Sequence, residues 1–258
     1  MSGFQVLLAK ELREAWRTRR LPMVALLFVV LGLISPLAAR YLPEILRAAL
    51  GDQLTIPIPA PVAADAVAQV QKNVGQMGAV AAIALAMGAV AGELDRGTAA
   101  LVLAQPVSRP VFLGAKLVAI AAVLGLATIA SVTVAWVYTA LLFAPMPIGG
   151  WLALVTLDWL GLCAWMALTF LASAATGSTT AAAGVGFMAW IGVSIAAVVP
   201  ALDRVLPTGL SEPAYRLAAG LTENVDGGRL TTAVAGTLAV IAIAVVGAMV
   251  SFGRRELR

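Results

Sequence analysis

The sequence contains no histidine, and this absence removes several kinds of functional site. Imidazole is the most frequent general acid–base group in enzymes and the most frequent metal ligand, so Ser-His-Asp triads and histidine metal sites are excluded. Cysteine occurs once, as Cys163, which excludes a disulfide within the chain and, inside an apolar run, predicts a small core residue. We expect neither a catalytic site nor a metal site in this chain.

Charged residues are scarce as well. They make up 12% of the 258 residues, whereas hydrophobic residues make up 61%, and soluble domains average about 25% charged residues. A water-soluble globule is therefore excluded, and the sequence predicts an integral membrane protein. The 17 basic side chains exceed the 13 acidic ones, but in a membrane protein this excess is more typical of orientation than of nucleic-acid binding, so we expect no nucleic-acid partner.

Long apolar segments dominate what is present. Because backbone polar groups in lipid have no water to bind, such segments are predicted to be helices of about 20 residues each. Six are expected, at about residues 21–39, 77–91, 111–143, 151–172, 180–199 and 231–252. The second is short for a span, and Asp65 could cap a helix that begins earlier and runs into it. The expected fold is an all-α integral membrane protein with six transmembrane helices.

The basic residues predict how these spans are oriented. If the N-terminus is cytoplasmic, six spans return the C-terminus to the cytoplasm, and most Lys and Arg residues then crowd the inner ends of the spans. The positive-inside rule describes this distribution. We therefore expect a multi-pass protein of the cytoplasmic (inner) cell membrane with both termini inside. The first apolar segment follows a basic leader, as signal peptides do, but its length favours a retained span.

The leader itself predicts an amphipathic helix at the membrane interface. Its apolar residues recur at helical spacing on one face, and its basic residues lie elsewhere. Such a helix suits the surface of the lipid bilayer or a partner protein, and both alternatives stay open. The chain is thus expected to divide into this helix, residues 1–20, and a six-span domain, residues 21–258.

Two longer connections are expected on the outer side of the membrane. Residues 40–76 contain the extended, helix-free stretch P-I-P-A-P. The other connection, at about residues 200–230, predicts a short surface helix with Ser211 as its N-cap, Pro213 in its first turn and Gly220 at its C-cap.

A charged stretch, residues 92–110, separates the second and third apolar segments, and the predicted orientation places it in the cytoplasm. Gly97 permits a sharp turn before a short apolar helix at residues 99–104. Residues that start or stop a helix flank it on both sides: Thr98 and Ser108 as caps, and Pro106 as a stop. The apolar side chains of this helix must be buried against the membrane surface, the leader helix or a soluble partner.

This stretch carries a family pattern. The residues from Gly92 to Lys116, G-E-L-D-R-G-T-A-A-L-V-L-A-Q-P-V-S-R-P-V-F-L-G-A-K, resemble the loop after the second span of type-2 ABC exporter permeases. That loop has the pattern E-x-x-x-G-T, a leucine-rich turn, P-x-S-R and then a lysine. The leader A-K-E-L-R-E-A-W-R-T-R-R is similar to the amphipathic entry helix of the same family.

The resemblance implies that the loop forms a cytoplasmic coupling helix that docks into a separate ABC ATPase subunit. The residues expected to take part are Glu93, Asp95, Arg96, Gly97, Thr98, Leu101, Leu103, Pro106, Ser108 and Arg109. It also implies two permease copies, identical or homologous, with two ATPases that bind ATP and Mg, so we expect no cofactor bound by this chain. The sequence lacks a G-x-x-x-x-G-K-[ST] loop, which agrees with a permease that is not itself an enzyme.

One acid, Asp158, lies well inside an apolar segment, where a charge is costly unless it faces protein or water. Partly polar stripes on the fourth and third segments are expected to line a substrate path. Their residues are Asp158, Trp165, Thr169, Ser131 and Tyr138. The alternatives are ordinary hydrogen bonding between helices and pairing of Asp158 with an outer arginine, Arg40 or Arg229.

Three other functions compete with an exporter permease. A stand-alone secondary transporter usually shows internal repeats and several buried charges, and an intramembrane enzyme needs a catalytic constellation that this sequence does not offer. A membrane anchor or scaffold for a soluble complex would also present a partner-binding loop. The substrate is not predicted by the sequence, although the modest polar stripes fit an amphipathic or lipid-like cargo.

Overall fold

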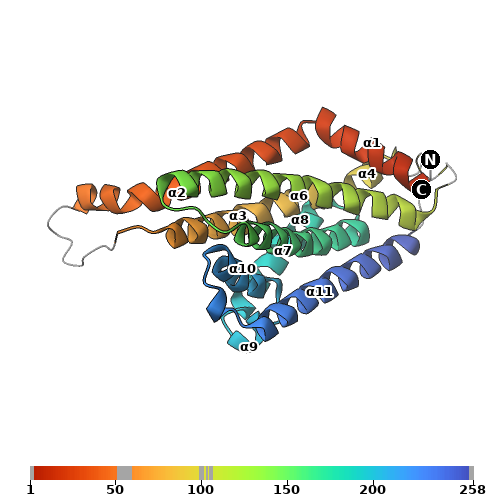
Figure 1. The fold of residues 1–258 in the computed structure, drawn as a ribbon. Coiled ribbons are helices and arrows are strands. Elements are labelled where there is room, and N and C mark those ends of the chain that lie inside the picture. The colour runs from red at the N-terminus through yellow and green to blue at the C-terminus, as the bar shows by residue number, and fades with distance from the viewer. Residues whose placement is uncertain (1–2, 51–59, 99–101, 103, 105–106, 256–258) are drawn as a thin grey trace.

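The computed structural model describes residues 3–50, 60–98, 102, 104 and 107–255, and every regular element in this part of the chain is a helix. Six of these helical segments are long and apolar enough to cross a membrane, as the sequence predicts. The start of the first helix and the end of the last one lie at one end of an elongated bundle (Figure 1). We call this end the terminal end, and the opposite end the distal end.

The leader forms α1 (Gly3–Arg17), and the chain then turns at Arg19, which has a φ of 60°, into α2 (Arg20–Leu50). This second helix continues well past the predicted end of the first span, so the prediction was too short. Arg40 and Glu44, one turn apart, form an ion pair of 3.2 Å that stabilises the polar extension. A hydropathy pattern detects apolar segments, so it does not predict helical turns that are stabilised by ion pairs.

The second span consists of α3 (Ala63–Met87) and the short α4 (Ala91–Asp95). Its predicted start was therefore wrong, because polar residues in the first half of α3 lower the hydropathy of a segment that is helical. The earlier start that Asp65 suggested is confirmed, but Asp65 is not the N-cap. It lies in the first turn of α3, where its carboxylate accepts a hydrogen bond of 2.9 Å from the backbone N–H of Val62.

Four further spans agree with the predicted segments to within a few residues. They are α6 (Arg109–Leu142), α7 (Ile148–Thr176), α8 (Thr179–Ala196) and α11 (Gly227–Gly253). The turn between α7 and α8 takes two residues, and Gly177 adopts a φ of 67° there, a conformation that residues with a Cβ resist. α7 and α8 therefore form a tight antiparallel pair.

Short helices fill the distal connection between α8 and α11. They are α9 (Pro200–Asp203), the 3-10 turn η2 (Pro207–Leu210), α10 (Ser211–Ala218) and the 3-10 turn η3 (Thr222–Asn224). The predicted short helix is α10, but Ser211 is its first residue and not its N-cap, because η2 runs directly into it. Gly220, with a φ of 77°, lies one residue beyond the C-cap and reverses the chain.

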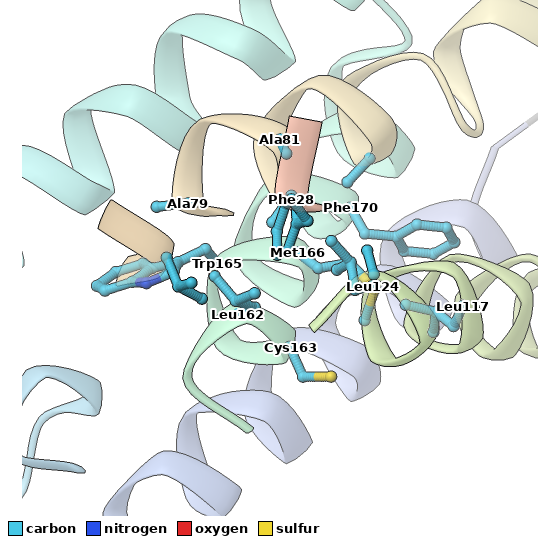
Figure 2. Packing of buried hydrophobic residues seen from close by; sticks show 14 of the residues in the cluster. Phe28, Ala79, Ala81, Leu117, Leu124, Leu162, Cys163, Trp165, Met166 and Phe170 are labelled. Carbon is cyan, nitrogen blue, oxygen red and sulfur yellow. The ribbon is translucent and has the colours of Figure 1, made fainter. Parts of the chain in front are cut away.

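The buried core surrounds α7, which packs against α3, α6, α8, α10 and α11. Figure 2 shows Phe28 of α2 and Met166 of α7 within this cluster, together with the predicted core residue Cys163, whose thiol is free. Helices in lipid associate through close packing more than through the hydrophobic effect. The contact of α2 with α6 illustrates this, since a Cβ at Gly32 would overlap the backbone carbonyl of Ser131.

Candidate functional site

The second span breaks at the terminal end of the bundle, just before the charged loop. The backbone leaves the helix between Gly88 and Val90, without a proline, and resumes as α4. The buried hydroxyl of Ser173, from α7, bridges the break: it donates to the carbonyl of Met87 (2.8 Å) and accepts from the N–H groups of Val90 (3.2 Å) and Ala91 (3.0 Å). This hydroxyl supplies the partners that a broken helix otherwise loses.

A group of charges, three of them mostly buried, lies at α4. We call Lys10, Glu11, Glu93 and Lys116 the ion-pair cluster. The Lys116 ammonium lies 2.6 Å from a Glu93 carboxylate oxygen and 3.1 Å from a Glu11 oxygen, and the Lys116 side chain is only 5% exposed. Lys10 reaches the same two oxygens, at 3.1 Å on Glu11 and 3.6 Å on Glu93. The cluster joins α1, α4 and α6, so the leader helix is fixed to both ends of the charged loop.

The charges of the cluster are mutually stabilised. Burial acts to raise the pKa of Glu11, but the charge of Lys116 and the hydrogen bonds from Lys10 and Lys116 outweigh it, so this pKa is lowered from its ordinary value. Burial acts in the opposite direction on Lys10, and there the contacts with Glu11, Glu93 and Glu14 prevail and raise the pKa. Glu11 therefore stays ionised at neutral pH.

The loop returns to the membrane at α6, and its first residue, Arg109, is anchored to the end of α11. The guanidinium donates hydrogen bonds to the carbonyls of Phe252 (3.0 Å), Gly253 (2.7 Å) and Arg255 (3.0 Å). It also lies over the Phe252 ring. Carbonyls at a helix C-terminus lack partners within the helix and carry partial negative charge, which a guanidinium satisfies.

Within the loop, several predicted features are present and others differ. Gly97 has a φ of 68°, which confirms the predicted sharp turn. Glu93 belongs to the charged stretch that was expected in the cytoplasm, but its side chain is mostly buried, since it belongs to the ion-pair cluster. Thr98 lies in a helical turn and its hydroxyl donates to the Glu93 carbonyl (3.3 Å). Ser108 occupies the N-cap position of α6, but its side chain makes no capping hydrogen bond.

The predicted short helix at residues 99–104 is described only at Val102 and Ala104. Val102 is helical and packs against the buried core, and Asp95 and Arg96, just before it, are exposed. Leu101, Leu103 and Pro106 lie outside the described residues, so their predicted part in coupling stays a prediction.

A second feature is a cavity of about 550 Å³ towards the distal end, which we call the distal cavity. It is lined by α3, α7, α8 and the η2–α10 segment. Of the five residues predicted to line a substrate path, Asp158 and Trp165 line this cavity. The other three, Thr169, Ser131 and the partly buried Tyr138, do not. Thr169 and Ser131 are buried between helices, and the Thr169 hydroxyl bonds its own helix at the Trp165 carbonyl.

The partner of Asp158 is an amide and not an arginine. Asp158 Oδ1 accepts a hydrogen bond of 2.9 Å from Gln71 Nε2 on α3. The predicted pairing with Arg40 or Arg229 was wrong, because those residues form ion pairs with Glu44 and with acids of the distal connection. Sequence reasoning missed Gln71, since it lies in the half of α3 that was not assigned to a span.

Comparison with known proteins identifies the chain. A family model described as "ABC-2 family transporter protein" matches residues 5–257. The chain belongs to the ABC-2 transporter family. It is also similar to the uncharacterized transmembrane protein YxlG of Bacillus subtilis (strain 168), at 27% identity over 212 residues, which covers 81% of this chain and 80% of that protein.

The ABC-2 assignment confirms the family resemblance of the charged loop and makes the chain a membrane-spanning transporter component. Membrane subunits of this family partner with ABC ATPase subunits. An ABC-2 permease therefore needs a surface for that partner, and the terminal end of this chain carries both the exposed residues of the loop and the charged contacts that fix it to the spans.

Proposed function

We propose that this protein is the permease subunit of an ATP-driven ABC exporter. Its six spans form the translocation pathway, and the loop between α4 and α6 docks into a separate ATPase subunit. The observation that carries this proposal is the anchoring of both loop ends. The ion-pair cluster ties the loop entry to α1 and α6, and Arg109 ties its exit to α11. A displacement of the loop by a partner would therefore move several spans together.

The proposed coupling residues fall into two groups. Asp95 and Arg96 are exposed and available to contact the ATPase directly, and Gly97 sets the turn that presents the next segment. Glu93 and Arg109 act within the chain, because their charged groups are already engaged. Together with the remaining predicted coupling residues, Thr98, Leu101, Leu103, Pro106 and Ser108, they form the docking element.

The proposed assembly contains two permease copies, identical or homologous, and two ATPase subunits. A two-fold arrangement is the commonest closed assembly of subunits. The ATPases bind ATP and Mg, and the permease contacts membrane lipids around its spans. The positive-inside distribution supports a cytoplasmic membrane location with the terminal end, and hence the loop and α1, on the cytoplasmic side.

Co-purification tests the proposal. The full-length protein is expressed together with the products of its neighbouring genes, and the amount of any ABC ATPase that co-purifies is measured. Gly97→Pro forces a φ near −65° where the loop needs a positive φ, so we expect it to abolish ATPase binding while membrane insertion is unchanged. Deletion of residues 99–103 should have the same effect.

Gly220→Pro is the matched control, because Gly220 also has a positive φ and donates one backbone hydrogen bond, but at the distal end. We expect it to retain the ATPase. Equal ATPase yields from the two variants would contradict the docking role. Transport that continues without ATP hydrolysis would instead favour a secondary transporter, and ATPase binding without any transport would favour an anchor.

A further inference from the structure

The distal cavity has the size and the walls of a ligand site. Its volume of about 550 Å³ falls within the range of about 300–1,000 Å³ that small-molecule sites occupy. Trp165, Trp190 and Tyr215 contribute aromatic surface from three different helices. Large apolar walls with a few polar groups are typical of sites that bind molecules with an apolar body.

Two of the side chains that line this cavity carry buried acceptor oxygens that lack donors. Asp158 Oδ2 and Gln71 Oε1 are out of contact with solvent, and neither has a hydrogen-bond partner in the described part of the chain. The two side chains are joined by the hydrogen bond between Gln71 Nε2 and Asp158 Oδ1, so their free oxygens are held near one another. Buried acceptors are costly when unmatched, and this pair would be matched by a donor on a ligand.

The charge balance inside the cavity favours a cation. Glu212 also lines the cavity, but Arg216 and Arg229 already neutralise it. Lys72 is exposed, so its charge is screened by solvent and salt. This leaves Asp158 as the acid of the cavity lining that forms no ion pair with the described residues, and a positive donor is the ligand group that would match its ionised form.

We propose that the distal cavity binds the ammonium group of an amphipathic molecule. The ammonium donates hydrogen bonds to the free oxygens of Asp158 and Gln71, and the apolar body lies against Trp165 and Trp190. Aromatic rings add attraction for a cation held over their faces. Two sources share this chemistry: a free amphiphilic amine and the headgroup of phosphatidylethanolamine.

Binding to the cavity does not depend on the ATPase, but the view that this molecule is the transported cargo rests on the proposed function. The two claims therefore need separate measurements. Binding is measured on the full-length permease in nanodiscs of phosphatidylcholine and phosphatidylglycerol, with radiolabelled dodecylammonium, dodecanol and dodecanoate as probes. Stimulation of ATP hydrolysis by dodecylammonium is measured on the complex with its ATPase.

We expect dodecylammonium to bind more tightly than dodecanol and dodecanoate. Asp158→Asn keeps an oxygen for the Gln71 amide but removes the charge, so it should weaken dodecylammonium binding at least about tenfold and leave dodecanol binding unchanged. Glu44→Gln, which removes an exposed acid of α2 outside the cavity, is the matched control and should bind like the wild type. Wild-type affinity in Asp158→Asn, or tighter binding of dodecanoate, would overturn the proposal.

A second variant keeps the test decisive if Asp158→Asn does not fold. Gly75 lines the cavity, and a Cβ there meets no atom within 4 Å, so Gly75→Leu adds side-chain volume at the cavity wall without a clash at its Cβ. It should abolish binding of both dodecylammonium and dodecanol, and unchanged binding would overturn the proposed location.

Adding phosphatidylethanolamine to the nanodiscs distinguishes the two sources. If phosphatidylethanolamine competes with dodecylammonium in the wild type but not in Asp158→Asn, the lipid headgroup is the ligand. If it does not compete in the wild type, the ligand is a free amine. If dodecylammonium binds but does not change ATP hydrolysis in the complex, the proposed binding site is supported and its role in transport is contradicted.

Discussion

At the scale of single residues, the terminal end depends on charges that are buried but matched. The Lys116 side chain is almost fully buried. The two carboxylates that face its ammonium offset the free-energy cost of burying that charge. Removal of one partner from such a group leaves uncompensated charge inside the protein. The same reasoning does not apply to Lys10, whose side chain is 43% exposed and can be solvated.

Lys116→Met should therefore destabilise the protein strongly, by about 3–5 kcal/mol. Glu11 and Glu93 would lose the more buried of the two lysines that contact them and keep only the partly exposed Lys10. The comparison variant is Lys10→Met, for which we expect a loss of less than about 1 kcal/mol, as for partly exposed ion pairs. Thermal unfolding in detergent checks both. Similar losses for the two lysines would show that the burial of Lys116 does not matter.

The lowered pKa of Glu11 predicts that the stability of the protein falls at acidic pH. Its pKa in the folded protein is lowered, so its ion pairs contribute stability that is fully present above the ordinary glutamate pKa, about 4.3, and is lost as the pH falls through the lower folded value. Acidification from neutral pH into this range should lower the melting temperature of the wild type more than that of Glu11→Gln. Parallel losses in the two proteins would contradict a stabilising role for ionised Glu11.

At the scale of helices, the most informative feature is the break in the second span. Such a break exposes backbone groups, and here one hydroxyl from another helix satisfies three of them. Along this span, the break lies between the residues that line the distal cavity and the charged loop. Because α4 is short and fixed by Ser173 and the ion-pair cluster, we infer that it moves as a unit with the loop.

Ser173→Ala should therefore cost about 1–3 kcal/mol, since buried N–H and C=O groups lose their partner. It should also reduce the coupling of ATP hydrolysis to transport. Thr156→Ala is the control on the same helix: its exposed hydroxyl bonds only the preceding turn of α7, and we expect a change within about 0.5 kcal/mol. Equal effects of the two variants on stability would contradict the bridging role.

The number and approximate positions of the six spans could be predicted from the sequence, because a helix that spans lipid needs a long apolar segment. The first half of α3 and the end of α2 escaped prediction, since polar residues there are stabilised by local ion pairs or by burial against other helices. Ser173 and Gln71 also escaped, as their partners lie more than 80 residues away in the sequence. The charged loop was recognised because its pattern is local. Asp158 was found as well, but the alternative that it pairs with Arg40 or Arg229 was wrong.

At the scale of the whole molecule, the two candidate sites lie towards opposite ends of the bundle. α1 lies at the terminal end (Figure 1). The distal cavity is lined by residues around the middle of α7, from Leu157 to Trp165, and by η2 and α10 of the distal connection. α3 and α7 contribute to both regions. In the proposed exporter, motion of an ATPase at the terminal end reaches the cavity through these two spans.

The central claim, that the loop at the terminal end docks into an ATPase, is tested most directly by cross-linking. Cys163 is the only cysteine, so a Cys163→Ala background allows a single thiol to be placed at Asp95→Cys, which is exposed on the loop, or at Glu44→Cys, which is exposed on the distal end of α2. A thiol-to-amine cross-linker is then added to membranes containing the ATPase. We predict a permease–ATPase product from Asp95→Cys and none from Glu44→Cys. No product from Asp95→Cys, or equal products from both positions, would contradict the account.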